Sequence, residues 1–153
     1  MPPPVPWPEE TGVWATYALH CHCGTIRYNI TISPPLLESQ SEGKGIYTAQ
    51  ECQCSHCLRQ GYTSCHPLAK NVEFTQGLEH RKEYRCGRGI CPHWFCEKCG
   101  CVLGSDLTAI EKMFGGEARN TINLRMLKDI SLDQLRIEKN HVMKGAPPEY
   151  HVD

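Results

Sequence analysis

The sequence predicts a mainly β fold with little helix, and three observations lead to that prediction. Several short segments alternate apolar with polar residues at a period of two, which is typical of strands. No segment keeps a helical period over several turns. Eleven cysteines occur among the 153 residues, and most of them gather in short clusters typical of loops that bind metal. We therefore expect strands joined by long, metal-bearing loops.

The clearest strand is expected within residues 25–33, TIRYNITIS. β-Branched and aromatic residues dominate this segment, and Gly24 before it and Pro34 after it should bound it with turns. Polar residues alternate with apolar ones, so one face of the strand should be buried. The residues expected on that face are Ile26, Tyr28, Ile30 and Ile32.

Other segments carry shorter signals. Residues 71–85 are expected to form two short strands around a Gln-Gly turn, and residues 118–127 alternate like a further strand. Residues 36–45 are polar and contain glycine, which favours a loop. The pattern Ser-x-x-Gln within residues 131–135 is that of a helix-capping box, and it predicts a single helical turn there.

The length fits one domain with its own core. Prolines crowd the first eight residues, and proline neither continues a helix nor enters the centre of a sheet. We expect residues 1–11 to form a flexible, extended arm and residues 12–153 to form a single zinc-binding domain.

Composition argues against several classes of function. The formal net charge is −1 and the pI is about 6.7, whereas nucleic-acid binding usually requires a strongly basic surface. No apolar run approaches the length of about 18 residues that spans a bilayer, and the N-terminus lacks the features of a secretory signal. We expect a cytoplasmic protein that binds neither nucleic acid nor membrane.

The cysteines are expected to bind metal instead of forming a disulfide framework. Their number is odd, no secretory signal accompanies them, and they are clustered as C-x-C and C-x-x-C. In a reducing compartment such clusters more often hold zinc. The clusters are CHCG at 21–24, CQCSHC at 52–57 and CEKCGC at 96–101.

The first and third clusters together supply one complete ligand set. In an extended segment, residues i and i+2 point to one side, so that C-x-C can direct both sulfurs at one ion. A C-x-x-C pair requires a tight turn, which the glycine after it allows. Four thiolates in a tetrahedral array form a closed structural zinc site. Its expected ligands are Cys21, Cys23, Cys96 and Cys99.

The middle cluster supplies three thiols, Cys52, Cys54 and Cys57. Three protein ligands with an exchangeable fourth position are the pattern of a catalytic zinc site. The spacing alone leaves open whether another cysteine closes this site. The remaining cysteines, whose roles the spacing does not assign, are Cys65, Cys86, Cys91 and Cys101.

The order of these motifs resembles the glutathione-dependent formaldehyde-activating (Gfa) family, also called the centromere protein V type. The matching segments are HCHCGTIRY, CQCSHCLRQG and WFCEKCGCVLG, and INLRML is similar to a late strand of that family. The resemblance extends over residues 19–135. It implies an Mss4-like fold of β-sheets around two zinc ions per chain, with Cys21, Cys23, Cys96 and Cys99 structural. It assigns the catalytic zinc to Cys52, Cys54 and Cys57, and thus favours an open fourth position.

The resemblance also implies an activity. In the Gfa family, glutathione and formaldehyde form S-hydroxymethylglutathione, which is a carbon–sulfur lyase reaction in reverse. The expected partner of this chain is accordingly a small thiol, or its adduct with formaldehyde or another carbonyl compound. Leu58 and Arg59 stand where the family often has a basic pair, and this departure leaves the substrate open. The alternative is a non-catalytic Mss4-like zinc module for protein interaction, with the proline-rich arm as a docking segment.

Two side chains of the middle cluster are candidates for substrate binding. Arg59 could pair with a substrate carboxylate or simply solvate a loop. His56 could move a proton beside an open zinc, or it could support the ligands from outside. His22 is expected to face away from its flanking cysteines.

Overall fold

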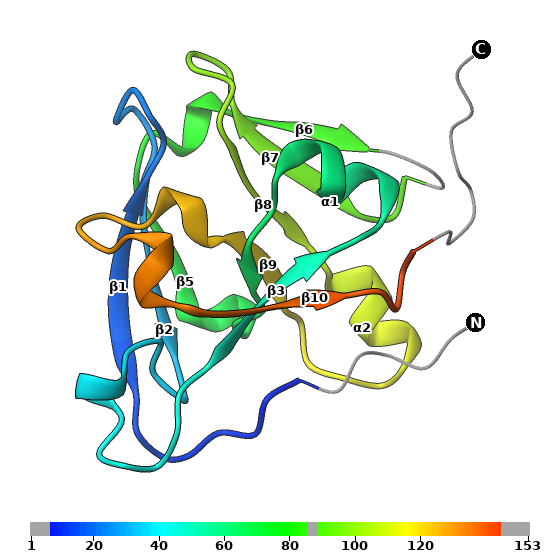
Figure 1. The fold of residues 1–153 in the computed structure, drawn as a ribbon. Helices are drawn as coiled ribbons and strands as arrows, with labels where there is room; N and C mark the ends of the chain where they lie inside the picture. The colour runs from blue at the N-terminus through cyan, green and yellow to red at the C-terminus, as the bar shows by residue number, and fades with distance from the viewer. Residues whose placement is uncertain (1–6, 86–88, 145–153) are drawn as a thin grey trace.

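The computed structural model describes residues 7–85 and 89–144 and confirms a mainly β fold with little helix. The smaller of its two sheets has the strand order β1-β2-β5, and both pairings are antiparallel. Figure 1 shows this sheet along one side of the molecule. Its strands are β1 (Ala15–His20), β2 (Arg27–Ile32) and β5 (Val72–Gln76).

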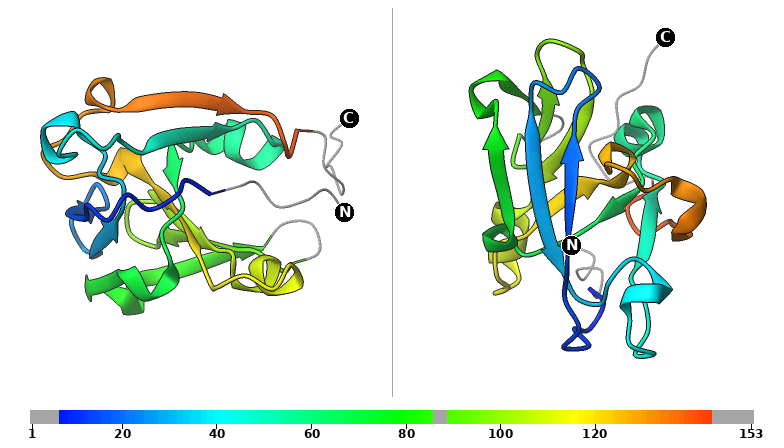
Figure 2. Two further views of the ribbon diagram at one scale, coloured as in Figure 1. Left: turned by 90° about the horizontal axis from the view of Figure 1, so that it is seen from below. Right: turned by 90° about the vertical axis from the view of Figure 1, so that its left-hand side faces the viewer.

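The larger sheet has the order β10-β3-β4-β9-β8-β7-β6. Only the β10–β3 pairing is parallel among the strands described. The sheet curves strongly, so that β10 and β3 lie opposite β6 and β7 in the left view of Figure 2. Its strands are β3 (Thr48–Cys52), β4 (Ser64–Cys65), β6 (Arg81–Arg85), β7 (Pro92–Cys96), β8 (Val102–Asp106), β9 (Asn120–Asn123) and β10 (Arg136–Asn140).

Helices are short throughout the described residues. The α-helices are α1 (Ser55–Gln60) and α2 (Thr108–Met113). Single turns of 3-10 helix cover Glu38–Gln40, Ala69–Asn71, Leu78–His80, Leu124–Met126 and Leu132–Gln134. The last of these carries the predicted capping box between Ser131 and Gln134.

The core lies between the two sheets, and β2 contributes its alternate residues to it. Ile26, which precedes the strand, and Tyr28, Ile30 and Ile32 within it are all at most 3% exposed, as the period-two pattern predicts. They pack in one cluster with residues of the larger sheet, including Leu103. Burying large apolar side chains on this scale is the main force that holds two sheets together.

The strands expected in residues 71–85 exist, but they do not form a hairpin with each other. β5 pairs with β2 in the small sheet, whereas β6 pairs with β7 in the large one. The 3-10 turn Leu78–His80 therefore carries the chain from one sheet to the other. This crossing places β6 beside β7 and brings Tyr84 directly opposite His93.

The described part of the N-terminal arm, residues 7–11, forms neither strand nor helix. It is nevertheless held against the body at Trp7, whose Nε1 donates to Glu111 Oε1 at 3.0 Å. The indole also lies on the His66 ring, with 4.4 Å between centroids, and the Arg119 guanidinium lies over the indole, 5.6 Å from its ring centroid. The domain boundary at residue 11 stays a prediction.

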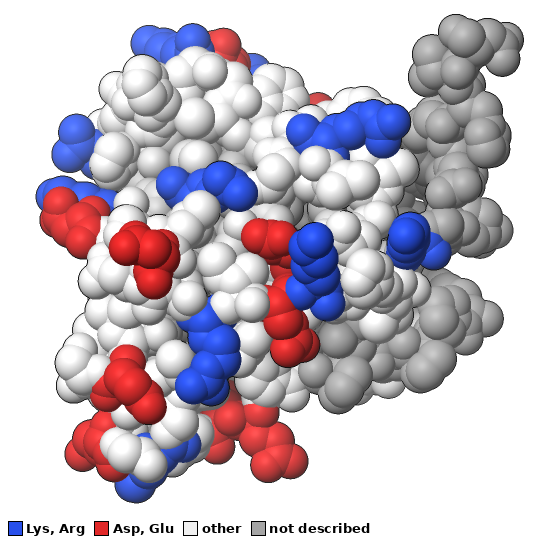
Figure 3. All heavy atoms as spheres, viewed as in Figure 1, with Lys and Arg blue, Asp and Glu red and all other residues white. Residues whose placement is uncertain are grey.

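The surface carries both signs of charge. Lys and Arg side chains alternate with Asp and Glu over the face drawn in Figure 3. In the described parts of the chain, no helix is long and apolar enough to cross a membrane.

Candidate metal centres and the adjoining cavity

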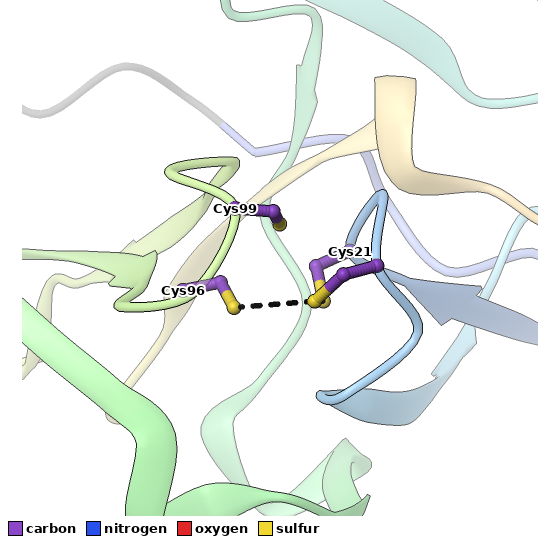
Figure 4. Close-up of side chains that lie close together, drawn as sticks. Cys21, Cys96 and Cys99 are labelled. Carbon is purple, nitrogen blue, oxygen red and sulfur yellow. Dashed lines mark hydrogen bonds between the residues drawn. The ribbon is translucent and has the colours of Figure 1, made fainter.

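The first and third cysteine clusters meet in space, as predicted. Cys21 and Cys23 lie in the turn between β1 and β2, and Cys96 and Cys99 lie at the turn between β7 and β8. All four sulfurs lie within 4.8 Å of one another. Figure 4 shows Cys96 and Cys99 facing Cys21, with Cys21 and Cys96 themselves fully buried.

Two similar turns present these thiols. The N–H of Gly24 donates to the Cys21 carbonyl at 3.0 Å, and the N–H of Gly100 donates to the Cys96 carbonyl at 2.8 Å. Both glycines have φ near +75° (74° and 76°), a conformation that costs other residues strain. The C-x-C pair of the first cluster thus lies in a tight turn and not in the extended segment that its spacing suggested. His22 between the two thiols is exposed, as expected.

Hydrogen bonds prepare these sulfurs to carry negative charge. The Ile26 N–H donates to Cys21 Sγ at 3.3 Å. Partial burial opposes ionisation of Cys99, but backbone N–H groups of Cys101 and Cys23 outweigh it and lower its pKa to about 6. Contacts with Thr25 lower the pKa of Cys23. Four thiols, two of them readily ionised, match the donor set of a closed zinc site.

The middle cluster forms a second, separate group. Cys52 ends β3, Cys54 caps the N-terminus of α1, and Cys57 lies in its first turns. Their sulfurs also lie within 4.8 Å of one another. The Cys57 N–H donates to Cys54 Sγ at 3.3 Å, so helix α1 itself fixes the second thiol relative to the third.

The three sulfurs are too close to ionise independently. Hydrogen bonds from Cys52 and then Cys57 hold the pKa of Cys54 far below its ordinary value. Hydrogen bonds with Cys52 first and with Cys54 second raise the pKa of Cys57 far above its ordinary value. A lone thiolate therefore forms easily here, while further ionisation requires a cation. A divalent, thiophilic ion such as zinc supplies that compensation, and the donor set fits it.

Among the described residues, no fourth cysteine, histidine or carboxylate joins the middle group. Cys65 is fully buried in β4, Cys91 is partly buried, and the Cys101 sulfur accepts the His22 N–H at 3.4 Å beside the first group. Cys86 lies outside the described residues. No disulfide joins the ten cysteines that the structure describes.

A surface cavity of about 220 Å³ is lined in part by helix α1, which carries Cys57, although none of the three thiols is in its lining. The ring of His56, which stands between Cys54 and Cys57 in α1, forms one wall of it. His93 of β7 lies against His56 with 3.8 Å between ring centroids, and Tyr84 of β6 stacks on His56 at 5.8 Å. The other lining residues are Gln60, Trp94, Phe95, Gly100 and Val102.

Both imidazoles feel the charge of the Cys54 thiolate in the middle group. Burial lowers the pKa of His56 and brings that of His93 to about 4, although the Cys54 thiolate pulls both values upward. The Nδ1 atoms of both rings are buried without a hydrogen-bond partner. A buried nitrogen of this kind is uncommon in folded proteins, and strain, a catalytic role, or a bound water or ion can account for it.

Of the two side chains predicted to bind substrate, the structure places one at the cavity. His56 lines it, whereas Arg59 is exposed and donates from Nη1 to the Ser55 carbonyl of its own helix at 3.1 Å. His93 and Tyr84 were not singled out from the sequence as site residues. They meet there only because β6 and β7 pair, and no local sequence motif predicts that pairing.

The fold and these two groups define a mainly β protein with two cysteine clusters that could each hold a metal ion. Neither a family model nor a curated protein matches the chain. Among solved structures, the chain is similar to a Rhodobacter sphaeroides protein whose crystal structure was determined as a structural-genomics target. The two are 22% identical with a TM-score of 0.59, over 80% of this chain and 99% of the other. At that identity the likeness shows a shared fold alone.

Proposed function

We propose that the protein is a zinc-dependent carbon–sulfur lyase of the Gfa type, acting on the adduct of a small thiol with formaldehyde or another carbonyl compound. One observation carries the proposal. Four thiols are grouped as a complete ligand set, while three others form a separate group at the start of helix α1, whose His56 and Gln60 line a cavity. This difference in the number of ligands supports a structural role for the first group and a catalytic role for the second.

The reaction we propose is the reversible cleavage of a thiohemiacetal. The carbon–sulfur bond breaks and its electron pair goes to sulfur, while the hydroxyl group loses its proton and becomes the carbonyl. A zinc ion held by Cys52, Cys54 and Cys57 would stabilise the departing sulfur as a thiolate. Three thiolates make zinc electron-rich, so that capture of a soft sulfur suits this donor set better than activation of water.

The chain's own residues contribute position and shelter. Helix α1 fixes Cys54 and Cys57 at one spacing through the hydrogen bond at its N-terminus. The imidazole of His56, which stands between Cys54 and Cys57 in the sequence, lines the cavity and can accept a hydrogen bond from the hydroxyl of an adduct. Partial enclosure by Tyr84 and His93 would keep the reacting group away from bulk water.

The activity can be measured as exchange between free aldehyde and thiohemiacetal by NMR, with glutathione and formaldehyde as reference reactants. We expect the zinc-loaded protein to accelerate exchange over the uncatalysed rate and Cys54→Ser to lose the acceleration. The matched control is Cys101→Ser, which removes a thiol outside both metal groups and should keep the activity. A fully loaded protein that accelerates no thiol–aldehyde pair would favour the non-catalytic interaction module instead.

A further inference from the structure

The described lining of the cavity beside helix α1 contains polar and aromatic side chains but no acidic or basic ones apart from histidine. Its lining, taken from the described residues, contains imidazole, phenol, amide, aromatic and aliphatic groups. It contains no lysine, arginine, aspartate or glutamate. A bound molecule would therefore meet hydrogen-bonding groups and rings, but no opposite charge from these walls.

Three cations on the flanking elements are already engaged elsewhere. Arg59 of α1 bonds to the carbonyl of Ser55. Arg85, next to Tyr84 in β6, pairs with Glu83 at 3.1 Å and donates to the Gly89 carbonyl at 2.8 Å. Lys82 of the same strand pairs with Glu97 at 3.2 Å. None of these three cations lines the cavity.

The rings that line the cavity, by contrast, pack against one another and present an aromatic surface to it. His56 and Tyr84 stack nearly parallel, with 14° between their planes, and His93 lies against His56. Trp94, Phe95 and Val102 complete the apolar part of the lining. Aromatic ligands gain from stacked or edge-on contacts with such rings.

We propose that this cavity binds the organic part of the thiol, and that it selects an uncharged thiol with an aromatic or bulky apolar group over a multiply charged peptide thiol. The inference rests on the proposed function and specifies its substrate class. A carboxylate brought into this lining would lose water without gaining a cation from the residues that the structure describes, which is costly. An aromatic ring there would lose little and gain stacking contacts.

The test is a titration of cobalt-substituted protein, in which a thiol that enters the coordination sphere shifts the visible spectrum. We expect benzyl mercaptan to reach half-saturation at a concentration at least about tenfold below that of glutathione, which is the factor that 1.4 kcal/mol represents. Equal or tighter binding of glutathione would overturn this inference and leave the proposed function standing. If no thiol shifts the spectrum, the proposed function itself fails.

A charge variant tests the walls directly. Gln60→Lys places a cation in the lining at an exposed position at the end of α1, and we expect it to tighten glutathione binding about threefold to tenfold. Leu58→Lys adds the same charge on the same helix outside the lining and should change glutathione binding much less. Equal effects of the two variants would mean that glutathione does not occupy the cavity, and would contradict the proposal.

A ring variant tests the aromatic contact. Tyr84→Ala should weaken benzyl mercaptan about threefold to tenfold, in line with the loss of one aromatic contact. Phe114→Ala, an exposed ring outside the lining, serves as the control and should leave the titration unchanged. Unaltered binding in Tyr84→Ala, with its circular dichroism preserved, would contradict the assigned position of the thiol's organic group.

Discussion

Cys54 joins two roles in one side chain, because its sulfur both caps helix α1 and belongs to the middle metal group. Hydrogen bonds from Cys52 and Cys57 keep the pKa of this thiol low, so it should be the first of the three to bind an ion as thiolate. Replacing it with serine preserves a cap but removes a soft ligand. The substitution therefore separates metal binding from folding.

We expect Cys54→Ser to remain folded and to carry one metal ion where the natural chain carries two. The group of four thiols lies elsewhere and keeps its ligands. The measurement is metal content per chain by mass spectrometry of the purified proteins, with circular dichroism to confirm the fold. Two ions in the variant, or a collapse of its fold, would contradict the assignment.

His66 offers a residue-scale prediction that does not depend on metal. Its burial lowers its pKa to about 3, with nearby Arg119 adding to the effect, whereas an unfolded histidine titrates near 6.5. The unfolded chain thus takes up a proton first as pH falls, and the folded state loses stability below about pH 6.5.

Between pH 7 and pH 5 this single residue should cost about 1–2 kcal/mol of unfolding free energy, allowing for its partial exposure. Urea unfolding of the natural chain and of His66→Gln at both pH values isolates the contribution. The variant should lose less stability over that interval, and an equal loss in the two chains would show that His66 keeps an ordinary pKa.

At the scale of elements, the strongly periodic parts of the sequence predict the structure well, whereas the sequence pattern does not predict the short elements. The alternation from Ile26 to Ile32 correctly predicts β2 and its buried face. Helices α1 and α2 have six residues each, too few to display a helical period. Strand β10, whose parallel partner is distant in the chain, carries no local signal of that pairing.

The candidate site likewise has one part that the sequence predicts and another that it does not. The seven cysteines are recognisable because metal ligands repeat at fixed short spacings, and their two groups form as the spacing suggested. The cavity is not recognisable in this way, since His56, Tyr84 and His93 come from three separate elements. Only the pairing of β6 with β7 and the position of α1 bring them together.

The N-terminal arm provides an element-scale prediction. Trp7→Ala should lower the unfolding free energy by about 1–3 kcal/mol, because it removes a ring contact and leaves the carboxylate of Glu111, only 6% exposed, without its donor. Trp7→Phe keeps a ring on His66 but loses the hydrogen bond, so its unfolding free energy should lie between those of the natural chain and Trp7→Ala. Trp14→Ala, an exposed indole nearby in sequence, is the control for urea unfolding and should change stability little.

For the whole molecule, the group of Cys21, Cys23, Cys96 and Cys99 joins the small sheet to the large one. Binding of a metal there would contribute directly to folding, because the site exists only in the folded chain. Cys99→Ser should therefore prevent accumulation of folded protein, in contrast to Cys54→Ser. Equal misfolding of the two variants, judged by circular dichroism and gel filtration, would contradict the division into structural and catalytic sites.

The central claim is that the metal held by Cys52, Cys54 and Cys57 has an exchangeable position that accepts an external thiol. X-ray absorption at the zinc edge counts the sulfurs around both ions together. With four thiolates at one ion and three at the other, we predict an average of about 3.5 sulfurs per zinc, rising to about 4 when a binding thiol is added. An average of four sulfurs before any thiol is added, unchanged afterwards, would mean a closed second site and would contradict the account.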